Sequence, residues 1–144
     1  MSFKKVLIAI DGEPVAVRAA ETGVDLAQAL GAEVAFVHVV DASLAYSGDT
    51  GTPASELIAT AKLDAKRLVT AMRQRLSPQA SVLEFIEVGT PSEEIVKAAK
   101  EWSADLLVIG SHGRGGMQRA LLGSVAETVM RHAPCPLVVV RSKA

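Results

Sequence analysis

Five short, mostly apolar runs, separated by stretches with helical spacing, limit what this chain can fold into more than any other feature. The first run, Val6–Ile10, is apolar throughout and stops at Asp11-Gly12, which is typical of a strand buried on both faces. The stretches between runs repeat their apolar residues at helical intervals, as from Leu57 to Leu76. The other four runs are Val34–Val40, Val82–Val88, Leu106–Ile109 and Leu137–Val140.

The residues that flank each helical stretch set its boundaries. Pro14 suits a first helical turn, Gly31 suits a helix end, and Ser77-Pro78 closes the second helix. The third and fourth helices are short and are centred on Ile95–Trp102 and Ser124–Arg131. This alternation predicts a single α/β domain with one open parallel sheet and helices on both faces, within the usual length of one domain.

The composition agrees with this architecture and excludes several classes of protein. Apolar residues make up 49% of the chain and aromatic residues only 3%, so the core must consist of Val, Ile, Leu and Ala. The net charge of -1 predicts neither a nucleic-acid surface nor a membrane surface, and no apolar stretch reaches the length of a membrane helix. The one cysteine, Cys135, excludes an intramolecular disulfide, and we expect a cytoplasmic protein without a secretory signal.

The most informative segment follows the fourth run, where an open α/β sheet would bind a ligand. It begins Gly110-Ser-His-Gly-Arg-Gly-Gly and ends at Ser124. Glycines let backbone amides approach an anion closely, and Arg114 adds positive charge. Ser124-Val-Ala-Glu matches a capping box, so a helix that begins at Ser124 should offer free amides to a phosphate. The segment alone is equally consistent with an ordinary turn and helix cap.

Other phosphate-binding motifs are absent from the chain. No Gly-x-x-x-x-Gly-Lys-[Ser/Thr] occurs, and the first run is followed by Asp11-Gly-Glu-Pro instead of Gly-x-Gly-x-x-Gly. The third run ends Glu87-Val-Gly, which does not supply the aspartate of a response regulator. P-loop NTPases, classical dinucleotide-binding folds and response regulators are therefore excluded.

The spacing Gly110-x2-Gly113-x9-Gly123-Ser124 resembles the nucleotide-binding signature of the universal stress protein family. The resemblance extends over the whole chain, residues 1–144, as one nucleotide-binding domain. Further matching segments are Lys5–Gly12, His38–Val40, Gly89–Pro91, Asp105–Gly110 and Cys135–Val140.

The resemblance implies a Rossmann-like, five-stranded sheet of order 3-2-1-4-5 that binds ATP with Mg²⁺. Asp11 would meet the adenine, the backbone of Val39 would contact the adenine edge, and Ala9 would lie close to the nucleoside. The resemblance places Gly110 and Gly113 along the ribose and phosphates, and Gly123, Ser124 and Val125 at the phosphates. The analysis of the loop adds the positive charge of Arg114. The resemblance also implies a homodimer, and the edge position of Leu137–Val140 predicts pairing through that strand.

Several residues carry a second interpretation. Glu13 stands where the family often has serine, so it could repel phosphates or help to hold Mg²⁺. Asp11 also suits a helix cap, and His38 is expected to pack at a strand end without a catalytic role. His132 and Cys135 are spaced like two metal ligands, but without a second pair they predict packing. The charged residues of the second helix predict a solvated face, among them Asp64, Lys66 and Arg67.

Together these observations predict an ATP-binding regulatory module of a stress response. Nucleotide would order the glycine-rich segment, and with it the loop from Asp41 to Pro53, and so bias the binding of an unknown protein partner. Two alternatives remain open at this point. One is a slow ATP hydrolase or nucleotidyl transferase, although no catalytic residue can be assigned. The other is a structural dimer that binds no nucleotide.

Overall fold

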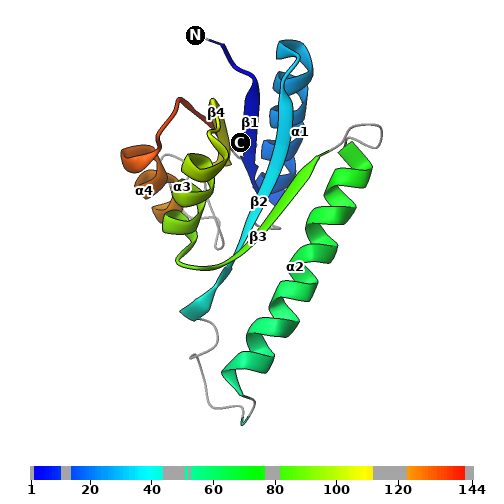
Figure 1. Ribbon diagram of the computed structural model, residues 1–144, viewed down its shortest axis with the longest axis vertical. Coiled ribbons are helices and arrows are strands. Elements are labelled where there is room, and N and C mark those ends of the chain that lie inside the picture. Colours follow the sequence, from blue (N-terminus) through cyan, green and yellow to red (C-terminus); the bar gives the residue numbers. More distant parts are fainter. Residues whose placement is uncertain are drawn as a thin grey trace.

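The computed structural model describes residues 2–10, 14–43, 51, 53–76, 82–111 and 123–141, with the side chains of residues 14–16 left out. Strands and helices alternate along the chain as predicted (Figure 1). Their bounds are β1 (Lys5–Ala9), α1 (Pro14–Leu30), β2 (Glu33–Asp41), α2 (Ala54–Leu76), β3 (Leu83–Gly89), α3 (Pro91–Trp102), β4 (Leu106–Gly110), α4 (Ser124–His132) and β5 (Leu137–Val140).

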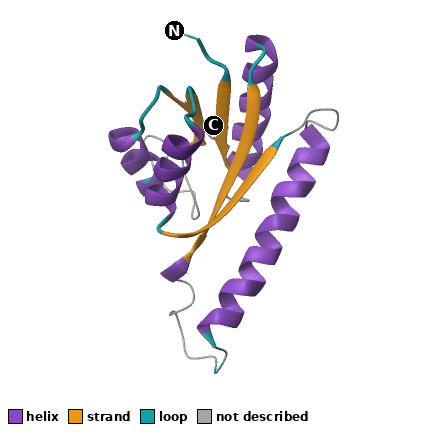
Figure 2. Cartoon of the chain, in the orientation of Figure 1, coloured by secondary structure: helices purple, strands orange, loops and turns teal. Residues whose placement is uncertain are grey.

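The strands form one open sheet of order β3-β2-β1-β4-β5, and each neighbouring pair is parallel. The predicted order 3-2-1-4-5 is therefore confirmed. Helices α1 and α2 cover one face of the sheet, and α3 and α4 cover the other (Figures 1 and 2). The strand order reverses between β1 and β4, so the crevice for a ligand is expected beyond the carboxyl ends of these two strands. Among the described helices, none is both long and apolar enough to cross a membrane.

The sheet divides the core into two halves according to the alternation of side chains along each strand. Val6, Ile8 and Phe36 pack against α1 and α2, whereas Leu7 and Val37 pack against α3 and α4. All five side chains are fully buried. The central strands are thus apolar on both faces, which explains why their sequences run without polar alternation.

Helix α1 lies unusually close to the sheet because of Gly23. A Cβ atom at this position would lie 2.5 Å from Cδ1 of Ile8, a distance that real Cβ contacts do not reach. The helix ends where the sequence predicts, since Gly31 has φ of +65°, which glycine adopts at low cost. Helices α2 and α3 begin a few residues before the first apolar residue of their pattern, because apolar spacing marks the buried face of a helix and not its first residue. Helix α2, for instance, begins at Ala54 and not at Leu57.

Helix α4 begins at Ser124 as predicted, but the predicted capping box is wrong. The N-cap residue is Gly123, and no side chain caps the helix. Ser124 is the first residue within the helix, so its hydroxyl is not placed to cap the amides that follow. The N–H of Glu127 donates to the carbonyl of Gly123 at 2.9 Å, as expected for the first intrahelical hydrogen bond after a glycine N-cap.

Candidate functional site

The end of β4, the start of α4 and the end of β5 are joined by two backbone hydrogen bonds through Ser111. Its N–H donates to the carbonyl of Val140 at 2.8 Å, and its carbonyl accepts from the N–H of Gly123 at 2.5 Å. Ser111 is only 3% exposed. Gly123, where the described chain resumes, therefore lies directly beside Ser111, where the chain leaves the sheet. The start of α4 is held at the carboxyl end of β4, beside the crevice.

The first turn of α4 presents backbone donors that have no intrahelical acceptor. The N–H groups of Ser124, Val125 and Ala126 precede the first intrahelical hydrogen bond, and within the described residues they donate to no other group. Gly123 offers no side chain that could take them up. The positive end of the helix dipole adds to these donors, so this turn favours an anion such as a phosphate. Ser124 is exposed, whereas Val125 packs partly against the core.

At the end of β2, the backbone N–H and C=O of Val39 point to the side of the strand on which β1 lies. Along a parallel strand the N–H and C=O of one residue point to the same neighbour, and the side alternates with each residue. Val37 accepts a hydrogen bond from the N–H of Ile10 at 2.8 Å, so Val37 and Val39 both face β1. The β1–β2 pairing ends at Ala9 opposite Val37, and no described hydrogen bond joins Val39 to β1. Within the described residues, one donor and one acceptor of Val39 thus have no partner on the β1 side.

The imidazole of His38 contacts the last described residue before the crevice. Its Nδ1 lies 2.5 Å from the carbonyl oxygen of Ile10. Because a carbonyl oxygen only accepts, Nδ1 carries the hydrogen and donates it. His38 does lie near the end of β2 and is partly buried, as expected, but the contact with Ile10 was not predicted.

Ala9 lies between these groups, at the carboxyl end of β1. It is the last residue of β1, is 7% exposed, and packs with the core beneath α3 and α4. Because β1 lies between β2 and β4, the small methyl group of Ala9 separates Val39 from the Gly110 end of β4. The described part of the predicted site is therefore gathered at one end of the sheet.

The remaining predicted site residues, Asp11, Gly113 and Arg114, lie outside the described residues, as does Glu13. Sequence reasoning missed two residues that shape the site, Ser111 and Ile10. Ser111 stood within the glycine-rich segment, but nothing in the pattern distinguished it from its neighbours. Ile10 carried only the signal of a buried strand residue, and its carbonyl contact involves a side chain distant in the sequence.

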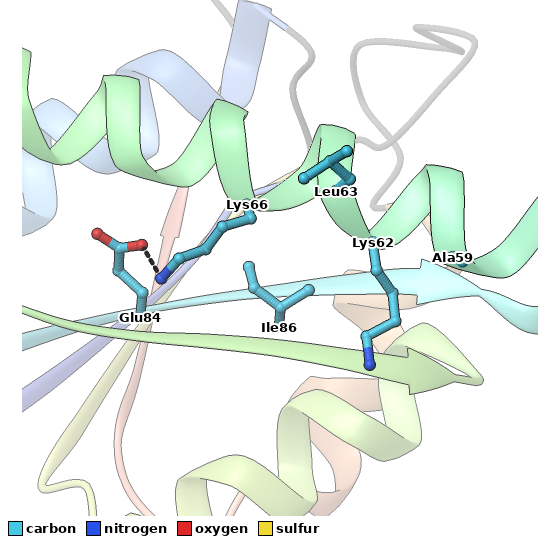
Figure 3. A pocket seen from close by; sticks show the side chains of 6 residues that line it. All are labelled: Ala59, Lys62, Leu63, Lys66, Glu84 and Ile86. Carbon is cyan, nitrogen blue, oxygen red and sulfur yellow. Dashed lines mark hydrogen bonds and ion pairs between the residues drawn. The ribbon is translucent and has the colours of Figure 1, made fainter.

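A shallow groove lies elsewhere, between α2 and the edge strand β3. It encloses about 620 Å³ and is lined by Ala59, Lys62, Leu63, Lys66, Glu84 and Ile86. Figure 3 shows Lys66 pointing to Glu84, with Ile86 rising from β3 toward the helix. The described residues of the groove include neither a helix N-terminus nor an unpaired strand end, and its Lys66 is already bound by the carboxylate of Glu84, which would repel a phosphate. We do not assign the nucleotide site to it.

Glu84 beside this groove is held by three side chains of α2. Lys66 approaches Oε1 at 2.7 Å, Thr70 donates to the same oxygen at 2.9 Å, and Arg73 donates to Oε2. Burial would raise the pKa of Glu84, but these hydrogen bonds outweigh it and hold the pKa below its ordinary value of 4.5. Lys66 does lie on a solvated face, as predicted, since its side chain is 57% exposed. Its ion pair with Glu84 was not predicted, because the pattern of α2 gave no sign of Glu84 opposite. Asp64 and Arg67 do form an exposed pair.

The described residues contain no group of three or more His, Cys, Asp or Glu side chains that could hold a metal ion. Cys135 is partly buried, as predicted. Burial and the nearby carboxylate of Asp105 raise the pKa of its thiol, which keeps the thiol protonated and weakly reactive near neutral pH.

Comparisons with known proteins agree with this geometry. Residues 2–141 match the model described as the Universal stress protein family. A universal stress protein of Methanocaldococcus jannaschii is 37% identical, and the match covers 96% of this chain and 82% of that protein. The solved structure of the universal stress protein UspA from Lactobacillus plantarum has 28% identity and a TM-score of 0.83, covering 98% of this chain and 99% of the other. A universal stress protein from Archaeoglobus fulgidus, solved in complex with dAMP, has 26% identity and a TM-score of 0.65, covering 98% and 100%.

Proposed function

Because the chain belongs to the universal stress protein family, we propose that it binds an adenine nucleotide in the crevice beyond the carboxyl ends of β1 and β4. The related protein from Archaeoglobus fulgidus that was solved with dAMP supports a nucleotide of this class. The proposed domain comprises the whole chain, residues 1–144. Within it, the described crevice supplies one group of donors for phosphates and one donor–acceptor pair for a base.

The free amides at the start of α4 are the single observation that carries this proposal most directly. Within the described residues the N–H groups of Ser124 and Val125 have no acceptor, and Gly123 adds no side chain that could cap them. Phosphate oxygens placed there would accept these hydrogen bonds and gain from the helix dipole. Gly110 lies one residue before Ser111, which binds the N–H of Gly123, so the end of β4 can contact the ribose.

The base would lie on the other side of Ala9, against the end of β2. Adenine carries an amino donor beside a ring-nitrogen acceptor on its Watson–Crick edge. The C=O and N–H of Val39 complement that pair, because both face the β1 side and no hydrogen bond among the described residues joins either of them to it. Asp11, Gly113 and Arg114 complete the proposed set, with Asp11 at the base, Gly113 at the ribose and phosphates, and Arg114 adding charge beside the phosphates.

The nucleotide proposed is ATP with Mg²⁺. A magnesium ion commonly binds between phosphate oxygens and only one or two carboxylates. It would therefore not require a group of three protein ligands, and the described residues contain no such group. Glu13 is the residue whose carboxylate would either support the ion or weaken the nucleotide. In this proposal the protein is a cytoplasmic, homodimeric switch of a stress response, with β5 at the dimer interface and a protein partner that reads the nucleotide state.

The proposal is tested by identifying what the protein carries after purification without added nucleotide. We expect mass spectrometry of the released small molecules to detect an adenine nucleotide at up to one equivalent per chain. Added ATP should also raise the melting temperature of nucleotide-free protein, since a ligand that binds only the folded state stabilises it. Protein that carries no nucleotide, and whose melting temperature ATP leaves unchanged, would favour the purely structural dimer.

A further inference from the structure

The carbonyl of Ile10 has an unusual hydrogen-bond partner for its place in a parallel sheet. The N–H of Ile10 donates to Val37, so a regular ladder would continue with the N–H of Val39 donating to the Ile10 carbonyl. That hydrogen bond is not formed among the described residues. The carbonyl instead accepts from Nδ1 of His38 at 2.5 Å.

We propose that His38 is a positioning residue of the nucleotide site. Its imidazole takes the place of the Val39 N–H on the Ile10 carbonyl, and so leaves that N–H free to bind an adenine edge. The contact satisfies the carbonyl of Ile10, the residue that follows β1, without using a β2 amide. This inference rests on the proposed function, since it explains how the strand end becomes available to a base.

The geometry of the two faces supports this role. His38 lies on the same face of β2 as Phe36, which packs under α1 and α2, whereas the side chain of Val39 packs on the opposite face. The imidazole therefore approaches the Ile10 carbonyl from the α1–α2 face of the sheet, opposite to the face on which Ala9 packs. A ligand on that side can contact Val39 without displacing His38.

Three variants separate a positioning role from simple packing. His38→Leu removes the donor at similar volume, so the Val39 N–H is expected to turn to the Ile10 carbonyl and extend the ladder. His38→Asn is the matched control, because its amide nitrogen is separated from Cα by the same number of bonds as Nδ1 and can donate to the same oxygen. His38→Val also lacks a donor and suits a strand, so it serves if the leucine variant does not fold.

Amide hydrogen exchange of Val39, measured by NMR, reports the proposed contact without any ligand. We expect the Val39 amide to exchange rapidly in the nucleotide-free wild type and in His38→Asn, and to be protected in His38→Leu. Rapid exchange in the leucine variant, or protection in the nucleotide-free wild type, would overturn the inference. This comparison holds even if ATP does not bind, in which case only the proposed function fails.

Nucleotide titration then tests the consequence for recognition. We expect His38→Leu to weaken ATP binding about tenfold or more, because the ring-nitrogen acceptor of the base loses the Val39 N–H. His38→Asn should stay within about threefold of the wild type. ITP carries a donor and an acceptor in the reverse order, so the wild type should prefer ATP strongly and the leucine variant should lose most of that preference. Equal ATP affinity and an unchanged ATP-to-ITP ratio in the leucine variant would overturn the positioning role.

Discussion

At the scale of single residues, Gly123 determines what the start of α4 can bind. Its φ of −66° and ψ of 158° are open to any residue, so backbone strain does not require glycine here. The absence of a side chain matters instead, since any good N-cap residue would place an oxygen on the amides that a phosphate needs. The helix thus retains free donors in its first turn.

This reasoning predicts opposite effects of one substitution on stability and on binding. Gly123→Asp should stabilise the protein by about a few tenths of a kcal/mol, because aspartate caps a helix better than glycine. The same carboxylate should abolish ATP binding, since it occupies the amides and repels the phosphates. Denaturant unfolding and calorimetric titration measure the two effects. Gly123→Ala is the control, as it adds a methyl group without an acceptor and should reduce binding only modestly; equal losses in both variants would contradict the account.

At the scale of secondary-structure elements, Glu84 fixes α2 to the edge strand β3. Its side chain is 7% exposed and is bound by Lys66 and Arg73, which lie two turns apart on α2. The groove of Figure 3 lies immediately beside this attachment. Helix α2 therefore depends on a polar contact at an edge where apolar packing is incomplete.

Glu84→Gln should lower the free energy of unfolding by about 1–2 kcal/mol at neutral pH, because it removes charge from these hydrogen bonds. The pKa of Glu84 is lowered in the folded state, so its contribution is fully present above the unfolded value near 4.5 and is lost as the pH falls through the folded value. The difference in stability between wild type and variant should therefore be constant near neutral pH and shrink below about pH 4.5. Unfolding curves across this range decide, and a difference that grows with acid would contradict the ion-pair account.

The sequence predicted the elements well and their individual contacts poorly, for a physical reason. Strand and helix follow from the spacing of apolar residues, which the chain displays directly, and the position of the site follows from the rule that parallel strands end at one edge. The contacts of Ser111 with Gly123 and of His38 with Ile10 join residues that no local pattern links. The capping box failed at Ser124 because the first intrahelical hydrogen bond goes to the carbonyl of Gly123, which makes the glycine the N-cap and places Ser124 inside the helix.

At the scale of the whole molecule, β5 ends the sheet and directs alternate backbone groups outward. The carbonyl of Pro136 accepts a hydrogen bond from Leu107 of β4, and the carbonyl of Val140 accepts one from Ser111. The backbone polar groups of Leu137 and Val139 therefore face away from β4. The proposed homodimer would pair these outward groups across a two-fold axis. Val140 itself is buried in the core, so a charged residue there would unfold the monomer as well as break a dimer.

Val139→Pro tests the dimer with less damage to the monomer. It removes an outward N–H but no hydrogen bond to β4, so we expect monomers that keep the wild-type circular dichroism. Val139→Thr retains the N–H and should remain dimeric. Light scattering at micromolar concentration distinguishes the two, and a proline variant that stays dimeric would place the interface elsewhere.

Any ATP turnover by this fold should be very slow. Rapid phosphoryl transfer needs a positioned nucleophile and charge stabilisation at the transferring group, and the chain contains no P-loop lysine. We expect phosphate release well below one turnover per second in a phosphate-detection assay. Several turnovers per second in contaminant-free protein would favour the hydrolase alternative.

The central claim is that an adenine nucleotide binds between the end of β2 and the start of α4. Titration of isotopically labelled protein with ATP, followed by amide NMR, tests it most directly. The account predicts the largest shifts at Ala9, Val39, Gly110 and Gly123–Val125, with none near Lys62 and Lys66 in the groove beside α2. Shifts confined to that groove, or no shifts at millimolar ATP, would contradict it.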